Sequence, residues 1–333
     1  MTMETLTTEA IETLAFDALT AAGTTPGNAR PLARATAVTE AMGVASHGLA
    51  YVPIYCEHVR CGKVAGDAVP AVTTPRPGVV RVDAGNGFAH PAIAAGFGPL
   101  VEAARTNGVA ALAIRNSYNC GVLGVHVQTL AETGMLGIGF TNAPASIAPS
   151  GGATPVVGTN PIALATPEGG LLIDQSASVI AKSEIMKHAR EGRPIPEGWG
   201  LDPEGQPTTD PEVALTGSMA PAGGYKGVGL SLIVEVMAAA MTGAVLGKDA
   251  SPFSGKAGGP PATGQFFLAM DPAATGDAFT QRMADLTGAI RAQSGARLPG
   301  DGRRAAQARA AEAGVAVAAG TLDKVRALAG AAP

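Results

Sequence analysis

The sequence is poor in charged residues, aromatic residues and cysteine. Only 15% of its 333 residues are charged and 4% are aromatic, whereas 46% are hydrophobic. The formal net charge is −4 and no block of five or more basic residues occurs, so we expect no nucleic-acid partner. The scarcity of aromatic residues also argues against base stacking. A chain with so little charge predicts extensive burial, and we expect an oligomer.

The cysteines are too few, and wrongly spaced, to form a four-ligand zinc site. There are three of them, Cys56, Cys61 and Cys120. We interpret them as free thiols of a reducing cytoplasm and expect no metal. Residues 1–10 have neither the basic nor the apolar region of a signal peptide, which also favours a cytoplasmic location.

Long apolar stretches are also rare, because only residues 228–246 form one. Glu235 lies in the middle of this run. A membrane span would place that charge near the bilayer centre at a cost of a few kcal/mol. The run therefore predicts a buried core helix, and we expect no membrane partner.

The pattern of hydrophobic residues predicts a mixed α/β protein, because helical and strand-like segments alternate. Helices are expected at residues 8–22, 31–42, 91–106, 122–132, 179–190, 228–246 and 276–291, after residue 304 and at the C-terminus. Strands are expected at residues 79–83, 109–114, 135–140, 171–174, 265–270 and 315–317. The GxGxxG fingerprint between a strand and a helix is missing, which disfavours a Rossmann domain.

One histidine, His47, lies in a small, sharply turning context between Ser46 and Gly48. Histidine is the side chain that can both give and take a proton near neutral pH. The hydroxyl of Ser46 is placed to orient the ring. We take His47 as a candidate acid–base residue, against the alternative of a loop histidine that only hydrogen-bonds locally.

Glycine-rich turns stand at the ends of several predicted elements. Residues 223–227 open the long apolar helix, and Lys226 adds a positive charge where backbone amides at a helix N-terminus can bind phosphate. Arg297, Arg303 and Arg304 form a second cationic segment, expected to be a loop. Residues 141–160 form a long loop, and loops of this length are usually functional.

Taken together, short motifs along nearly the whole chain resemble the type-2 malate/L-lactate dehydrogenase family, also called sulfolactate-dehydrogenase-like oxidoreductases. In chain order the motifs are Ala45-Ser46-His47-Gly48, Val82-Asp83-Ala84, Asn116-Ser117, Ala148-Pro149, Gly158-Thr159-Asn160-Pro161, Ile173-Asp174, Gly223-Gly224-Tyr225-Lys226-Gly227 and Arg297-Leu298-Pro299-Gly300. Residues 195–198 and 207–211 are most similar to two subgroups, the 3-sulfolactate dehydrogenases and the reductases of piperideine-2-carboxylate and pyrroline-2-carboxylate.

The resemblance implies a homodimeric NAD(P)-dependent oxidoreductase, with NADP favoured because those subgroups mostly use it. It implies a non-Rossmann cofactor domain with a largely antiparallel sheet flanked by helical segments. We expect residues 1–75 to form a helical segment carrying His47, residues 76–295 the cofactor and substrate core, and residues 296–333 a segment packing back on the N-terminal part.

The resemblance also assigns roles to individual residues. It implies that His47 is the proton donor, with Ser46 and the carboxylate of Glu184 in a relay. Tyr51 and Tyr55 are expected at the substrate. The cofactor is expected to contact Asn119, Cys120, Gly121, Val122, Leu123, Thr159, Asn160, Asp174, Gln175, Ser176, Lys226, Gly300, Gly302 and Arg303.

Two positions depart from the family's pattern and leave the substrate open. Tyr51 stands where members usually carry an arginine that holds the substrate carboxylate, and Asn119 stands where many carry histidine. The replacement cation remains open among Lys182, Arg115 and Arg60. We expect hydride transfer at C2 of a 2-oxo or 2-hydroxy acid such as 3-sulfolactate or malate. The alternatives are reduction of a cyclic imino acid and a non-catalytic relative.

Overall fold

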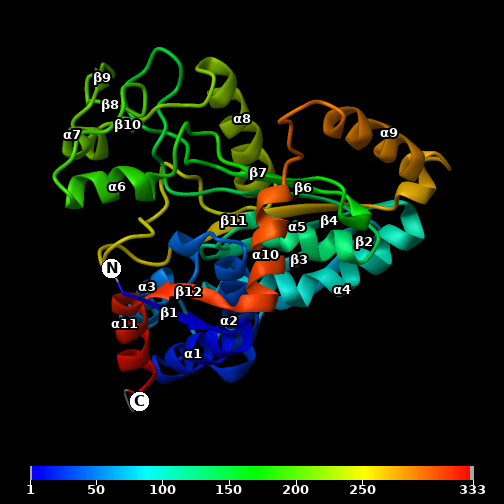
Figure 1. Cartoon of the computed structure of the whole chain (residues 1–333), viewed down its shortest axis with the longest axis horizontal. Helices are drawn as coiled ribbons and strands as arrows, with labels where there is room; N and C mark the ends of the chain where they lie inside the picture. The colour runs from blue at the N-terminus through cyan, green and yellow to red at the C-terminus, as the bar shows by residue number, and fades with distance from the viewer. Residues whose placement is uncertain (1, 331–333) are drawn as a thin grey trace.

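A seven-stranded sheet forms the centre of the protein, which is described by a computed structural model covering residues 2–330 (Figure 1). The strand order is β2-β3-β4-β11-β5-β6-β7, and every neighbouring pair is antiparallel except β3 with β4. The strands are β2 (Ala71–Arg76), β3 (Val79–Asp83), β4 (Val109–Ser117), β5 (Leu136–Thr141), β6 (Ile162–Ala165), β7 (Leu172–Gln175) and β11 (Thr263–Met270). The expectation of a mixed α/β fold with a largely antiparallel, non-Rossmann sheet is confirmed.

Helices cover both faces of this sheet. Helices α4 (Ala89–Asn107) and α5 (Leu123–Glu132) pack on one face, and α8 (Tyr225–Glu235) with the π-helical turn Val236–Ala240 lies on the other (Figure 1). Successive side chains of a strand point to opposite faces, so Phe267 joins the first core and Phe266 the second. The inner strands of the sheet are therefore covered on both faces.

The two ends of the chain form a layer together. Helices α1 (Thr8–Ala21), α2 (Pro26–Ala41) and α3 (Val52–Arg60) share one core with α11 (Ala319–Ala329). Strand β1 (Met3–Leu6) pairs antiparallel with β12 (Val315–Ala318). Helix α10 (Asp301–Ala313) runs from the sheet to this layer and contacts α2 (Figure 1).

A small lobe projects from the sheet between β7 and α8 (Figure 1). It contains α6 (Lys182–Arg190), α7 (Pro211–Thr216) and a three-stranded sheet in the order β10-β8-β9. Its strands are β8 (Gly200–Leu201), β9 (Pro207–Thr208) and β10 (Ser218–Met219). Helix α9 (Phe279–Arg291) follows β11.

Most predicted elements are confirmed with shifted ends. The second helix begins at Pro26 rather than Pro31, because Pro26 occupies the first turn, where no amide is needed. The cationic segment is not all loop, since Asp301 starts α10. Strands β1, β2 and β6, the two-residue strands β8, β9 and β10, and helices α3 and α7 were not predicted; all six residues of β2 are exposed, so no apolar pattern marks that strand.

The prediction of a buried core helix at residues 228–246 is wrong. Helix α8 and its π-helical turn end at Ala240, and Leu232, Ile233, Val236 and Met241 are 48–60% exposed. An apolar run alone does not distinguish a helix buried within one chain from a helix that presents an apolar face outward.

Two other expectations concern membrane spans and thiols. Over residues 2–330, no helix combines the length and hydropathy needed to cross a bilayer. The three cysteines are free, as expected, with Cys56 and Cys120 buried and Cys61 exposed.

Candidate active site

His47 ends a short 3₁₀ turn, Ala45–His47, between α2 and α3. Buried Glu40 of α2 fixes this turn by accepting a hydrogen bond from the amide of Leu49 at 2.7 Å. A Cβ at Gly48 would lie 2.4 Å from the Glu40 carboxylate, so only glycine fits there. Burial raises the pKa of Glu40.

The Ser46 hydroxyl lies 3.0 Å from Nδ1 of His47. No other hydrogen bond to this ring occurs within residues 2–330, which leaves Nε2 as the atom that can exchange a proton. Burial lowers the pKa of His47, and the negative charge of Asp174 partly opposes this. The ring is therefore mostly neutral at pH 7 and is protonated as the pH falls.

Asp174 connects three segments of the predicted site. It lies on β7, and its Oδ2 accepts hydrogen bonds from Nη1 of Arg303 at 2.8 Å and from the amide of Gly124 at 3.1 Å. Its side chain is 10% exposed and that of Arg303 26%. These contacts bring together the start of α5, the end of β7 and the start of α10, which are far apart in sequence, and the charge of Asp174 acts on the pKa of His47.

Glu184, the acid predicted for the relay, lies half-buried on α6 in the small lobe, whereas Asp174 was predicted only as a cofactor contact. Within residues 2–330 it forms no hydrogen bond with Ser46 or His47. In a single chain, the carboxylate that acts on the pKa of His47 is Asp174.

Three aromatic rings extend from His47 into the protein. The Tyr51 ring lies parallel to His47 with 6.0 Å between centroids, and Tyr55 packs edge-on against Tyr51 at 4.8 Å. Burial raises the pKa of Tyr51 to about 12, so its phenol is neutral at pH 7. Tyr118, which sequence reasoning missed, is buried behind both and packs against Tyr55. In the sequence, a single tyrosine after a strand does not indicate that its ring packs against Tyr55.

Hydrogen bonds from its own residues and from His126 fix the predicted cofactor loop at residues 119–123. Oδ1 of Asn119 accepts a hydrogen bond from the amide of Gly121 at 2.6 Å, and Gly121 has φ +66°, which favours glycine. Nε2 of His126 donates to the carbonyl of Cys120 at 2.8 Å. His90 lies under Gly121, and burial lowers its pKa well below the usual value. Sequence reasoning missed both histidines, which lie on separate helices.

The turn after β7 and the start of α8 line one pocket of about 510 Å³, to which Gln175, Ser176 and Lys226 contribute. Gly224 precedes α8 with φ +64°, and Lys226 is exposed in its first turn. This combines free helix N-terminal amides with a cation, as expected for an anion site.

The Thr159–Asn160 turn is held by an internal network. Asn160 is fully buried, and its Nδ2 donates to Oε2 of Glu235 at 2.7 Å and to the carbonyl of Ser231 at 3.0 Å. Oε1 of Glu235 accepts from the amide of Gly247 at 2.7 Å. The Asn160 side chain therefore positions the turn, while the half-buried Thr159 is the residue of the pair available to a ligand.

The candidate cations lie in different surroundings. Arg115 pairs with Asp83 at 3.0 Å, and Arg60 lines a separate pocket with Cys61 and Lys256. Lys182 follows the segment lining the Lys226 pocket, and burial lowers its pKa. Gly300, one of the predicted cofactor contacts, packs so closely on Leu172 that a Cβ at Gly300 would lie 2.7 Å from the Leu172 side chain.

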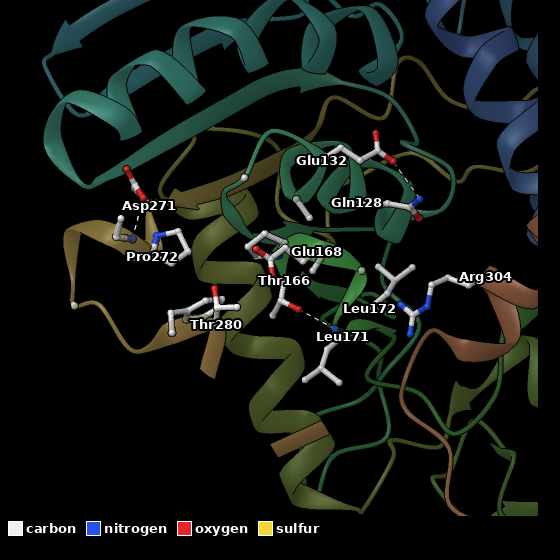
Figure 2. A pocket seen from close by; sticks show the side chains of 18 of the residues that line it. Gln128, Glu132, Thr166, Glu168, Leu171, Leu172, Asp271, Pro272, Thr280 and Arg304 are labelled. Carbon is white, nitrogen blue, oxygen red and sulfur yellow. Dashed lines mark hydrogen bonds between the residues drawn. The ribbon is translucent and has the colours of Figure 1, made fainter. Parts of the chain in front are cut away.

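A larger pocket of about 700 Å³ lies elsewhere, between the end of α5, the turn after β6 and the segment before α9 (Figure 2). Its charged lining is mostly acidic, with Glu132, Glu168 and Asp271 around it and Arg304 at one edge (Figure 2). None of the predicted catalytic residues lines it, and its acids do not suit a phosphate.

Comparison with known proteins gives one family. The family model described as malate/L-lactate dehydrogenase matches residues 6–326. The chain is 45% identical over 297 residues to a (2R)-3-sulfolactate dehydrogenase (NADP(+)) of Chromohalobacter salexigens, covering 88% of this chain and 89% of that protein. It is 38% identical to a Delta(1)-pyrroline-2-carboxylate reductase of Ancylobacter novellus, covering 96% and 95%.

A solved structure agrees with these relatives. The fold matches the crystal structure of delta1-piperideine-2-carboxylate reductase from Pseudomonas syringae with a TM-score of 0.92 and 36% identity, covering 98% of this chain and 99% of that one.

Proposed function

Because this chain belongs to the malate/L-lactate dehydrogenase family, we propose that it is an NADP-dependent oxidoreductase acting at C2 of a small 2-oxo or 2-hydroxy acid. The observations that carry the proposal are the His47 ring, held at Nδ1 by Ser46 with Nε2 free, and the Asp174–Arg303 pair, whose carboxylate acts on the pKa of His47. A titratable imidazole with one free nitrogen, beside a carboxylate and a cation, is an arrangement suited to acid–base catalysis.

His47 has the role of proton donor and acceptor. Ser46 orients the ring through Nδ1, so Nε2 gives a proton to the substrate oxygen or nitrogen in reduction and takes it back in oxidation. Asp174 favours the protonated ring. Glu184 remains a second candidate acid, and replacing Asp174 and Glu184 separately by their amides distinguishes the two: the one that acts on His47 shifts the pH dependence of turnover.

The residues present fit a dinucleotide phosphate. The first turn of α8 offers amides and Lys226 beside the pocket that Gln175 and Ser176 line. A Cβ at Gly223 or Gly224 would meet nothing within 4 Å, so the backbone there is open to a ligand. We expect Lys226 and Ser176 to hold the phosphates, with Asn119, Thr159 and the segment at residues 121–123 along the rest of the cofactor. When bound, NADPH supplies the hydride. The preference for NADP over NAD follows the name of the sulfolactate relative.

The substrate is the open part of the proposal. The similar proteins divide between 3-sulfolactate dehydrogenase and cyclic imino-acid reductases, and Tyr51 contributes no charge for a carboxylate. Of the three candidate cations, Lys182 is best placed, because Arg115 is paired and Arg60 lies in another pocket.

The test is NADPH and NADH oxidation, followed by absorbance, with sulfopyruvate, oxaloacetate, pyruvate, pyrroline-2-carboxylate and piperideine-2-carboxylate. Turnover of one class, with at least tenfold preference for NADPH, is expected. Absence of turnover with every substrate and both cofactors would favour the non-catalytic alternative and refute the proposal.

The exposed face of α8 supports a homodimer. Leu232, Ile233, Val236 and Met241 form an apolar surface next to the Lys226 pocket. We expect Ile233→Glu to give a monomer in sedimentation, whereas Leu286→Glu, at an equally exposed position on α9, leaves the dimer intact. A monomeric wild-type protein would contradict this.

Three successive stretches of the chain contribute different parts of the proposed site. We propose that residues 1–75 present His47, that residues 76–295 hold the cofactor and substrate, and that residues 296–333 return Arg303 to the site; β12 of this last stretch pairs with β1. Three free thiols are consistent with work in the reducing cytoplasm.

A further inference from the structure

A buried lysine anchors a loop segment that contacts Tyr51. Residues 252–257, here called the strap, lie between α8 and β11. Lys63, 1% exposed, donates from Nζ to the carbonyls of Pro252 at 2.7 Å, Gly255 at 3.1 Å and Ala257 at 2.9 Å. Within residues 2–330 no carboxylate pairs with it. Burying an ammonium group costs several kcal/mol unless it is well hydrogen-bonded, so the strap's position depends on these three bonds.

A buried histidine holds the strap at a further point. Nε2 of His58 donates to the carbonyl of Gly255 at 3.0 Å. Because a carbonyl only accepts, the proton sits on Nε2, and Nδ1 accepts from the hydroxyl of Tyr118. The strap, Tyr118 and α3 are thereby locked together.

The strap carries an aromatic side chain, and its backbone contacts Tyr51, the ring neighbour of His47. The ring of Phe253 packs against Tyr118 with 5.5 Å between centroids, and its carbonyl accepts a hydrogen bond from the Tyr51 hydroxyl at 3.3 Å. The Tyr51 ring in turn lies parallel to the ring of His47. Phe253 is only half-buried, so part of its ring is free to meet a ligand.

We propose that Phe253 determines substrate specificity, as a wall on the substrate side of His47 that excludes bulky groups from C3 of the substrate. Lys63 and His58 are positioning residues that hold this wall. The inference rests on the proposed function, because it takes His47 as the site of proton transfer. With Tyr51 bonded to the strap, the group carried on C3 of the substrate meets an aromatic surface, which favours substrates with a compact C3 group.

The test compares a compact acid that the wild-type enzyme reduces with phenylpyruvate. In Phe253→Ala, kcat/KM for phenylpyruvate relative to the compact acid is expected to rise at least tenfold, while KM for NADPH stays unchanged; Phe253→Leu should lie between. One methylene in a pocket is typically worth 10- to 200-fold in discrimination. Lys63→Met should also raise kcat/KM for phenylpyruvate relative to the compact acid. Faster amide hydrogen exchange at residues 252–257 in this variant would show that the strap is released.

The control is Lys256→Ala, because Lys256 is on the strap but points to solvent, where it pairs with Glu57 at 3.4 Å. It should leave the substrate ratio unchanged. If the wild-type enzyme is active and kcat/KM for phenylpyruvate relative to the compact acid changes less than twofold in Phe253→Ala, this inference alone is wrong. If the wild-type enzyme reduces nothing, the proposed function fails and this inference fails with it.

Discussion

Replacing Asp174 by asparagine tests the connection on which the site depends. The substitution keeps the shape of the side chain and an oxygen that can accept from the amide of Gly124, but it removes the charge that Arg303 pairs with. It also removes the charge that raises the pKa of His47.

The expected loss of stability follows from the contacts. A hydrogen bond to a charged group contributes about 1.5–3 kcal/mol, and leaving a buried charge unpaired costs more. Arg303 is 26% exposed, so water replaces part of what Asp174 supplied. We expect the free energy of unfolding to fall by about 2–3 kcal/mol. Asp301→Asn is the matched control: it keeps an oxygen that can accept from the amide of Leu298 but removes the charge that pairs with Arg304, and this pair, about one-third exposed, contributes less than about 1 kcal/mol.

The two effects are measured by urea unfolding and by the pH dependence of NADPH oxidation. Reduction needs protonated His47, so activity falls as the pH rises through its pKa. Without Asp174 that pKa is lower, and the fall should begin at lower pH than in the wild-type enzyme or Asp301→Asn. If Asp174→Asn destabilises no more than Asp301→Asn and leaves the pH profile unchanged, the proposed role of Asp174 is refuted.

Two further predictions concern buried polar groups. Glu235→Gln turns one of the two acceptor oxygens of Glu235 into a donor that faces Asn160 or Gly247, so we expect the free energy of unfolding in urea to fall by about 2–4 kcal/mol. The control, Glu212→Gln at an exposed position on α7, should cost under about 0.5 kcal/mol. Equal effects of the two substitutions would contradict the hydrogen-bond network around Glu235. Burial lowers the pKa of His58, His90 and His126 in the folded state, so their contribution to stability is complete above about pH 6.5 and is lost as the pH falls below that value. The melting temperature should therefore drop from pH 7 to pH 5, and drop less in His90→Gln; a wild-type melting temperature independent of pH over this range would refute it.

Much of the fold was predictable because the strands of the central sheet are marked by local composition. The apolar runs at β4 and in the second half of β11 are visible in sequence, and the missing GxGxxG correctly disfavoured a Rossmann domain. Strand β2 was not predictable, since all six of its residues are exposed and its conformation comes from pairing with β3. The exposure of α8 was not predictable either, because burial within one chain and an apolar outer face have the same composition.

The site was predictable where a short motif and its local geometry coincide. Ser46 next to His47 gives the hydrogen bond directly, and the glycines before Lys226 give the start of α8. The contacts of Asp174, and the chain of interactions from Lys63 through the strap to Tyr51, join residues 50 to about 200 positions apart. Only the folded chain brings such pairs together, so no spacing in the sequence reports them.

The central claim is that His47 transfers the proton, and single-turnover oxidation of bound NADPH by His47→Ala tests it most directly. With saturating substrate we predict a rate 10²- to 10⁴-fold below that of the wild-type enzyme, with NADPH affinity unchanged by fluorescence titration. A rate within threefold of the wild-type value, at unchanged NADPH affinity, would contradict the account.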